Sequence, residues 1–150
     1  MPIDAESYRI IPIDQHIECV DTIVSWIAGE WGTSSLDEFK QSLIENRQCP
    51  PTLIAVSEDE PIAVLAYKLY PSPMQGSLEL WVNALYVATS WRGRGIGSHL
   101  LREGVKIAAS WDRTQLYAYT EVPQFYERLG WRRLSDDDVN EMHVVEIRIR

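Results

Sequence analysis

The sequence predicts an α/β domain in which a mixed sheet of six or seven strands carries helices on both faces. One observation is that segments rich in β-branched and aromatic residues alternate with segments whose apolar residues recur every three or four positions. A second is the order of these segments: strand, helix, helix, three strands, helix, strand, helix and two strands. The chain has 150 residues, of which 45% are hydrophobic. This is enough to bury a core in one domain spanning residues 1–150.

The first half of the chain contains three predicted strands and two predicted helices. Residues 7–13 (SYRIIPI) are typical of a strand, and from Ile17 the apolar residues take the helical spacing until the segment GEWG. We expect Ser35 to cap the second helix, because Glu38 follows three residues later in a capping box. Residues 52–70 predict two strands joined by the polar turn SEDEP.

The second half of the chain begins with a predicted strand at residues 78–88. A glycine-rich loop follows, and residues 95–110 have the amphipathic spacing of a helix. A strand at residues 114–120 and a short helix at residues 122–130 come next. The segments WRRL and MHVVEIRI complete the chain as strands.

Composition argues against several classes of protein. The net charge of −8 disfavours nucleic-acid binding, which needs a basic face. No apolar run approaches the roughly 20 residues that span a bilayer, and the N-terminus MPIDAESYRI has acids where a signal peptide has lysines. Cys19 and Cys49 lack a metal or redox spacing, and His16, His99 and His143 are scattered. We therefore expect a cytoplasmic protein with reduced thiols, no metal ion and no membrane partner.

Charge is distributed unevenly along the chain. Residues 1–60 contain 12 acids and 3 bases, while residues 91–113 contain five bases and two acids. One interpretation is that solvent-exposed helix faces carry these charges. The other is that an anionic ligand binds near the basic segment and a cationic ligand near the acidic N-terminal half.

The segment RGRGIG, residues 92–97, lies between a predicted strand and a predicted helix. A helix N-terminus has unpaired amides and a partial positive charge, and glycines allow an anion to approach those amides, so this segment is suited to a phosphate or pyrophosphate. A P-loop is excluded, because it ends in Gly-Lys-Ser/Thr where this segment ends in Gly97-Ser98-His99. A dinucleotide fingerprint fits poorly, because its spacing is G-x-G-x-x-G and it follows the first strand of its unit.

The same segment resembles the Q/R-x-x-G-x-G/A signature of the GCN5-related N-acetyltransferase (GNAT) family. The strand NALYVATSW before it is similar to the family's fourth strand, and FYERLGW at residues 125–131 is similar to the late motif FYEKLGF. The element order matches as well, so the resemblance covers nearly the whole chain. It implies a mostly antiparallel sheet that splays between its fourth and fifth strands, with acetyl-CoA entering the gap.

The resemblance also implies which residues hold the donor. Main-chain groups of the fourth strand would bond the pantetheine, and amides of the glycine loop would bond the pyrophosphate. Leu85 and Val87 could pack in the core as well, because the ligand needs only their main chain. The residues expected to bind acetyl-CoA are Leu85, Tyr86, Val87, Arg92, Gly93, Arg94, Gly95, Ile96 and Gly97.

Tyr126 matches the tyrosine that hydrogen-bonds the CoA sulfur in the family. The resemblance implies that it acts as general acid towards the departing thiolate. The alternative is that Tyr126 is a half-buried aromatic residue on an amphipathic helix, as we expect for Phe125.

The general base is less well defined by the sequence. An amine acceptor with a pKa near 10 must lose a proton, so an acid should lie near the splay. In histone-modifying members a glutamate stands eleven positions before the signature, where this chain has Trp81. Strand alternation places Glu79, Trp81, Asn83 and Leu85 on one face, which makes Glu79 the first candidate. Glu30 in GEWG is the second; it could instead bind a cationic substrate, and either acid could simply be exposed.

These observations predict an acetyl-CoA-dependent N-acetyltransferase that acts on a primary amine by direct attack. The acidic N-terminal half favours a cationic acceptor: a polyamine, an aminoglycoside-like antibiotic, or a peptide or protein amine. Two alternatives stay open, a non-catalytic acyl-CoA sensor and, more distantly, a dinucleotide-dependent oxidoreductase. The apolar segment MHVVEIRI would permit a homodimer.

Overall fold

The computed structural model describes residues 7–31, 36–45, 48–73, 76–137 and 139–149, so the predicted cap Ser35 lies outside the described residues. The strands are β1 (Arg9–Pro12), β2 (Leu53–Ser57), β3 (Glu60–Pro71), β4 (Leu78–Val87), β5 (Gln115–Thr120), β6 (Arg132–Asp137) and β7 (Met142–Arg148). The helices are α1 (Val20–Trp31), α2 (Leu36–Glu45), α3 (Ile96–Ser110) and α4 (Pro123–Glu127), with 3₁₀ turns at Ile13–Gln15, Ile17–Cys19 and Thr89–Trp91.

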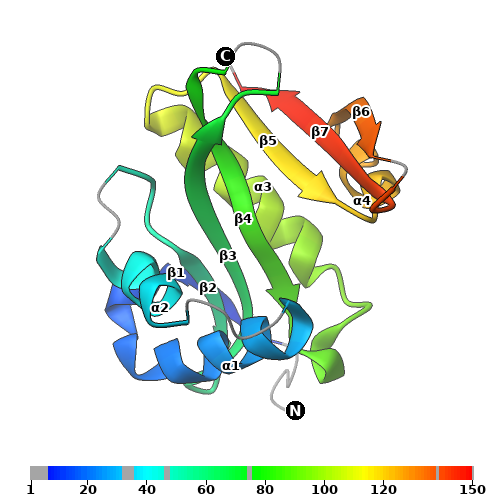
Figure 1. Ribbon diagram of the computed structural model, residues 1–150. Coiled ribbons are helices and arrows are strands. Elements are labelled where there is room, and N and C mark those ends of the chain that lie inside the picture. Colours follow the sequence, from blue (N-terminus) through cyan, green and yellow to red (C-terminus); the bar gives the residue numbers. More distant parts are fainter. Residues whose placement is uncertain (1–6, 32–35, 46–47, 74–75, 138, 150) are drawn as a thin grey trace.

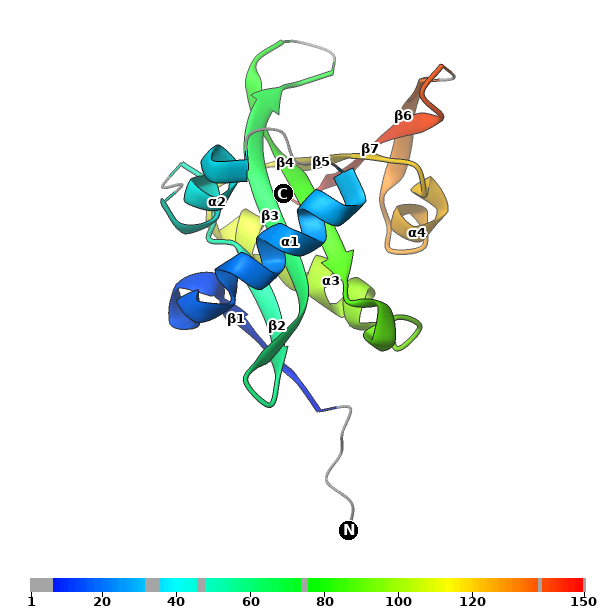
Figure 2. The ribbon, with the colours of Figure 1, turned by 60° about the horizontal axis from the view of Figure 1, so that its bottom comes forward.

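The strands form one sheet with the order β1-β2-β3-β4-β5-β7-β6. The pair β4–β5 is parallel, and the other pairs are antiparallel. Helices α1 and α2 cover one face of the sheet and α3 covers the other (Figures 1 and 2). This confirms the predicted mixed, mostly antiparallel sheet with helices on both faces.

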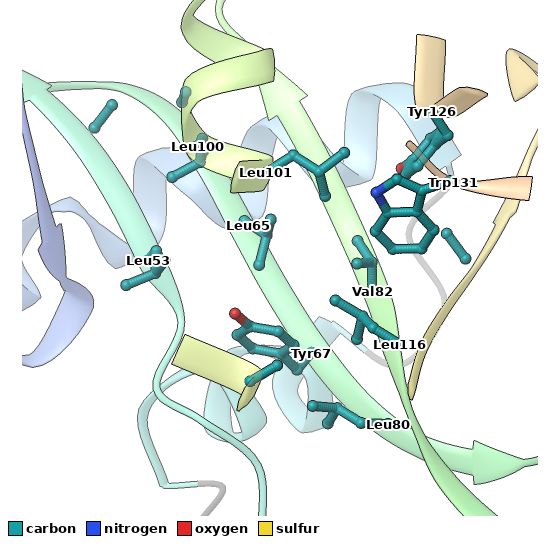
Figure 3. Packing of buried hydrophobic residues seen from close by; sticks show 14 of the residues in the cluster. Leu53, Leu65, Tyr67, Leu80, Val82, Leu100, Leu101, Leu116, Tyr126 and Trp131 are labelled. Atoms are coloured by element: carbon teal, nitrogen blue, oxygen red, sulfur yellow. The ribbon is translucent and has the colours of Figure 1, made fainter. Parts of the chain in front are cut away.

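Each face of the sheet has its own apolar core. On the α3 face, Leu65 and Leu80 of the sheet pack with Leu100, Leu101 and Leu116, all of them fully buried (Figure 3). Burying a side chain of this size stabilises the fold by roughly 1.5–3 kcal/mol. The second core, under α1 and α2, joins the helix residues Ile23 and Leu43 to Ile54 and Val64 of the sheet.

Helix α3 lies very close to the sheet at Gly104. The Tyr67 hydroxyl donates a hydrogen bond to the Gly104 carbonyl at 2.6 Å. A Cβ at position 104 would lie 2.9 Å from that hydroxyl and 3.0 Å from a methyl group of Leu65. This close contact holds α3, and the loop at its N-terminus, against β3.

Strands β4 and β5 pair over only two positions, Trp81 with Tyr117 and Val82 with Ala118. Beyond Val82, β4 stays paired with β3 as far as Val87 on one edge, and no strand of the described residues pairs with its other edge. The sheet therefore opens at the position that the resemblance implied.

A β-bulge lies where the sheet opens. Ala66 pairs with Ala84 and Tyr67 pairs with Val82, so Asn83 is the extra residue of β4. The bulge reverses the alternation of faces. Leu85 packs with Leu80 and Val82 in the α3 core, while Ala84 packs under α1. The prediction that Glu79, Trp81 and Leu85 share a face is therefore wrong, because strict alternation does not allow for an inserted residue.

Candidate active site

A cavity of about 1060 Å³ occupies the opening between β4 and β5. One part of its lining comes from the second half of β4 and the glycine loop, and another part comes from side chains of α1, β3, β5 and β7. We call these the loop end and the open end. The predicted donor residues that line the cavity are Leu85, Tyr86, Val87, Arg92, Gly93, Gly95, Ile96 and Gly97; Arg94 is not among the lining residues.

The glycine loop turns sharply before α3. Gly93 has φ of 79° and Gly95 has φ of 82°, both in the left-handed region that costs a residue with a Cβ about 1 kcal/mol or more. Gly95 caps α3, and no side chain bonds the first amides of the helix. Across the described residues, the amides of Gly93, Gly95, Ile96 and Gly97 donate no hydrogen bond. The loop thus presents unpaired donors at a helix N-terminus beside the cavity.

Gly97 differs from the other two glycines. A Cβ there would make ordinary contacts, 3.5 Å from Val87 and 3.6 Å from Phe125. Neither strain nor a clash requires glycine at this position. Within the loop, the conformational requirement falls on Gly93 and Gly95.

The arginines of the loop pack on aromatic rings. The Arg92 guanidinium donates from Nε to the Val87 carbonyl at 2.9 Å and lies 5.1 Å from the centre of the Tyr86 ring. Trp26 of α1 stacks on the same ring, with centroids 5.4 Å apart. Arg94 lies over Trp91 at 4.8 Å. Arg92 therefore links the loop to the free edge of β4, where the pantetheine was expected.

Tyr126 lies at the cavity wall on α4. Its ring makes an edge contact with Trp131 at 5.0 Å, and only 6% of the residue is exposed (Figure 3). Its hydroxyl bonds no described residue, and no fully buried side-chain oxygen of the described residues lacks a partner. The hydroxyl must therefore reach the cavity that Tyr126 lines. Burial raises the pKa of Tyr126 well above 10, so the phenol is protonated at neutral pH.

Comparison with known proteins identifies this architecture. A family model described as the acetyltransferase (GNAT) family matches residues 16–131. The chain belongs to this family. Membership confirms the predicted family and the enzyme class, acetyltransferase, and it agrees with the prediction of acetyl-CoA as the donor. No curated protein matches the chain.

Solved structures share the GNAT fold at low sequence identity. A chain of the NatC complex bound to Gag peptide and CoA is 21% identical with a TM-score of 0.77, and the match covers 95% of this chain and 98% of that one. An aminoglycoside 6'-N-acetyltransferase complexed with coenzyme A is 17% identical with a TM-score of 0.77, covering 95% and 97%. A putative GNAT acetyltransferase from Desulfovibrio desulfuricans is 18% identical with a TM-score of 0.70, covering 96% and 99%.

The two acids predicted as base candidates lie in different places in the GNAT fold. Glu30, at the end of α1, is exposed and lines the open end. Glu79 does not line the cavity; it pairs with Tyr70 where β4 is flanked by β3, and its charge contributes to raising the pKa of Tyr117, after burial and Glu146. Of the two candidates, Glu30 therefore lines the cavity and Glu79 lies outside its lining.

Several residues that line the cavity were not predicted. Lys68 of β3 and Glu121, directly after β5, both line the cavity, as do Asn83, Tyr119 and Met142. The sequence gives no motif for these residues, because they come from different strands and only the sheet order brings them together. Trp81 also lines the site, its ring 5.1 Å from Tyr117. No metal-binding group of three or more His, Cys, Asp or Glu side chains occurs in the part of the chain described.

Proposed function

We propose that this GNAT protein is an N-acetyltransferase that moves the acetyl group of acetyl-CoA to a primary amine by direct attack in a ternary complex. The acceptor would be a small amine, an antibiotic, or a peptide or protein amine. The observation that carries the proposal is one cavity with unpaired amides at its loop end, the Tyr126 hydroxyl in its wall and carboxylates at its open end. The CoA bound in the NatC and aminoglycoside acetyltransferase structures supports the choice of donor.

The loop end would hold the donor. The amides of Gly93, Gly95, Ile96 and Gly97 would bind the pyrophosphate, because they are unpaired and lie at a helix N-terminus. The free edge of β4 from Leu85 to Val87 would bond the pantetheine as an added strand does. Acetyl-CoA supplies the activated acyl group, and the chain supplies its position relative to the amine.

Tyr126 would stabilise the departing thiolate by hydrogen bonding. A thiol has a pKa of about 8.5, and the pKa of Tyr126 is raised by burial from an ordinary value of 10.0. Complete proton transfer from the phenol to the thiolate is therefore uphill, while a short hydrogen bond to developing negative charge is favourable. The buried phenol is suited to that role because it is protonated at any physiological pH.

The acidic side chains of the open end would receive the amine. An ammonium with a pKa near 10 must lose its proton before it attacks. Glu30 and Glu121 line the open end and are exposed, so either can take that proton directly or through water. Glu79 is a weaker candidate than the sequence indicated, because it lies outside the cavity lining.

The test is turnover with acetyl-CoA and a panel of primary amines: a polyamine, an aminoglycoside and a peptide with a free N-terminus. We expect release of the CoA thiol in equal amount to an N-acetylated product identified by mass spectrometry. Binding of acetyl-CoA without acetylation of any amine would contradict the proposal.

One observation favours a second candidate function, a non-catalytic acyl-CoA sensor. Trp81 occupies the strand position where histone-modifying members have a glutamate, and it packs between Tyr70 and Tyr117. Tyr126→Phe separates the candidates, because an enzyme loses turnover and keeps CoA affinity, whereas a sensor has no turnover to lose.

The compartment that we propose is the cytoplasm. Cys19 and Cys49 are both buried and are not joined in a disulfide, as expected in a reducing environment. No helix of the described residues is long and apolar enough to cross a membrane.

A further inference from the structure

Lys68 is a half-buried cation at the open end of the cavity. It lies on β3 directly opposite Trp81 of β4 and lines the cavity. Its neighbour Tyr67 packs in the α3 core, so alternation places Lys68 on the opposite face, the one covered by α1. Glu30 reaches the cavity from α1 on that same side.

No carboxylate of the described residues forms an ion pair with Lys68. Desolvation lowers the pKa of Lys68, and no neighbouring carboxylate counteracts that shift. Its nearest described partner is aromatic: Nζ lies 4.7 Å from the centre of the Tyr70 ring, a contact that favours the charged ammonium. Half-buried charges are usually paired, so Lys68 has the environment of a cation whose counter-ion is a ligand.

The anion that fits Lys68 is not the pyrophosphate of the donor. Lys68 lies opposite Trp81, which is six residues along β4 from Val87, the last residue of the strand before the glycine loop. At about 3.3 Å per residue, Trp81 and Val87 are roughly 20 Å apart along the strand. The pyrophosphate already has its own amides at the loop end, whereas Lys68 lies opposite Trp81, where β4 and β5 are still paired.

We infer that the acceptor amine of this enzyme carries a carboxylate, as an amino acid or an acidic peptide does, and that Lys68 binds that carboxylate. The inference rests on the proposed function, because it assigns the substrate class of the same site. Glu30 and Glu121 line the same cavity as Lys68, so the cavity offers carboxylates for an ammonium and one ammonium for a carboxylate. A zwitterion matches this pattern, because it carries one ammonium and one carboxylate. A phosphate dianion does not match it, because its two negative charges would lie near both acids with only one cation to bind them.

An acceptor with a carboxylate is a narrower class than the cationic acceptor expected from composition. The acidic N-terminal half of the chain favours a cationic acceptor, and the carboxylates that line the cavity favour a positive charge on the reacting amine. Lys68 adds a second requirement at the other end of the acceptor. A polyamine satisfies only the first requirement, because it would place a second cation near Lys68.

The experiment compares acceptors that share an amine and differ only in the carboxylate: β-alanine with β-alaninamide, and L-lysine with L-lysinamide. We expect the wild-type kcat/KM to favour each acid over its amide by about tenfold or more, as a charge-assisted hydrogen bond allows. Lys68→Met should abolish that preference through KM, and Lys68→Arg should retain it. The control Lys106→Met removes an exposed lysine that pairs with Glu103 on α3, away from the cavity, and should leave the preference unchanged.

The outcomes separate the inference from the function on which it rests. Turnover with equal kcat/KM for acids and amides overturns the inference and leaves the proposed function intact. A Lys68→Met variant whose kcat/KM falls equally for the acid and for the amide has the same meaning. If no amine is acetylated, the proposed function fails, and calorimetric binding of the same four compounds to the CoA-loaded protein decides the inference. Tighter binding of the acids that is lost in Lys68→Met would support it, and equal binding would overturn it.

Discussion

The loop end of the cavity takes its residues from one continuous segment, Leu85 to Gly97, whereas the open end takes its residues from four separate elements, α1, β3, β5 and β7. At the loop end the groups that we propose bind the ligand are main-chain amides, set by two glycines with positive φ. At the open end the proposed groups are side chains such as Glu30 and Lys68. Binding by main-chain groups depends on the conformation of the backbone, and binding by side chains depends on which amino acids are present. We therefore expect substitutions at the two ends to act differently.

The largest expected effect is that of Tyr126→Phe, which removes the phenol hydroxyl from the cavity wall. We expect kcat to fall about 100-fold, because one hydrogen bond to developing charge is lost, while the Kd of CoA changes less than twofold. Steady-state kinetics and CoA calorimetry measure the two quantities. Tyr67→Phe is the matched control: it deletes the hydroxyl bonded to Gly104, so stability should fall by about 1 kcal/mol with kcat unchanged. A normal kcat in Tyr126→Phe would contradict the role.

The next effect tests whether the loop end depends on conformation. Gly95→Ala introduces a Cβ into open space but at φ of 82°, so the turn is strained by about 1 kcal/mol or more. We expect the Kd of CoA to rise about tenfold as the amides shift. Gly76→Ala has a similar φ of 73°, open surroundings and no place in the cavity lining. It should lose comparable stability in thermal unfolding and no CoA affinity; equal CoA affinities in the two variants would refute the distinction.

A smaller effect concerns stability in alkali. Burial raises the pKa of Tyr126 above its unfolded value of 10.0, so the folded state retains a proton that the unfolded state loses. The stabilisation is complete below pH 10 and decreases above it, by about 0.8 kcal/mol at pH 10.5 for one such group. In urea unfolding, the stability difference between wild type and Tyr126→Phe should shrink by this amount between pH 8 and pH 10.5. A difference that does not change with pH would show that the phenol titrates normally.

The smallest expected effect compares two acids near the open end. Glu30→Gln should raise the KM of an amine acceptor about threefold, because it removes one exposed carboxylate from the cavity lining. Glu79→Gln should change it less than twofold, because Glu79 does not line the cavity. The reverse order in acceptor kinetics would restore Glu79 as the base candidate.

The same contrast explains what could be predicted from the sequence. The loop end could be predicted because its residues are consecutive and its chemistry, glycine and amide at a helix start, is local. Asn83 could not be recognised as a bulge, because the apolar residues of this strand are equally compatible with strict alternation and with one inserted residue. Lys68 and Glu121 could not be placed at the site, since they meet only through the strand order β3-β4-β5.

The two-residue pairing of β4 with β5 has a consequence for the order of folding. Strands β3 and β4 are neighbours in the sequence, whereas the segment between Trp81 and its partner Tyr117 contains the whole of α3. Closing the longer segment costs more chain entropy, and only two residue pairs offset that cost. We expect pulsed hydrogen exchange to show β3 and β4 amides protected before those of β5; simultaneous protection would contradict this order. The opening that receives the ligands would then be the last part of the sheet to assemble, and a ligand bound across it would select the fully folded chain.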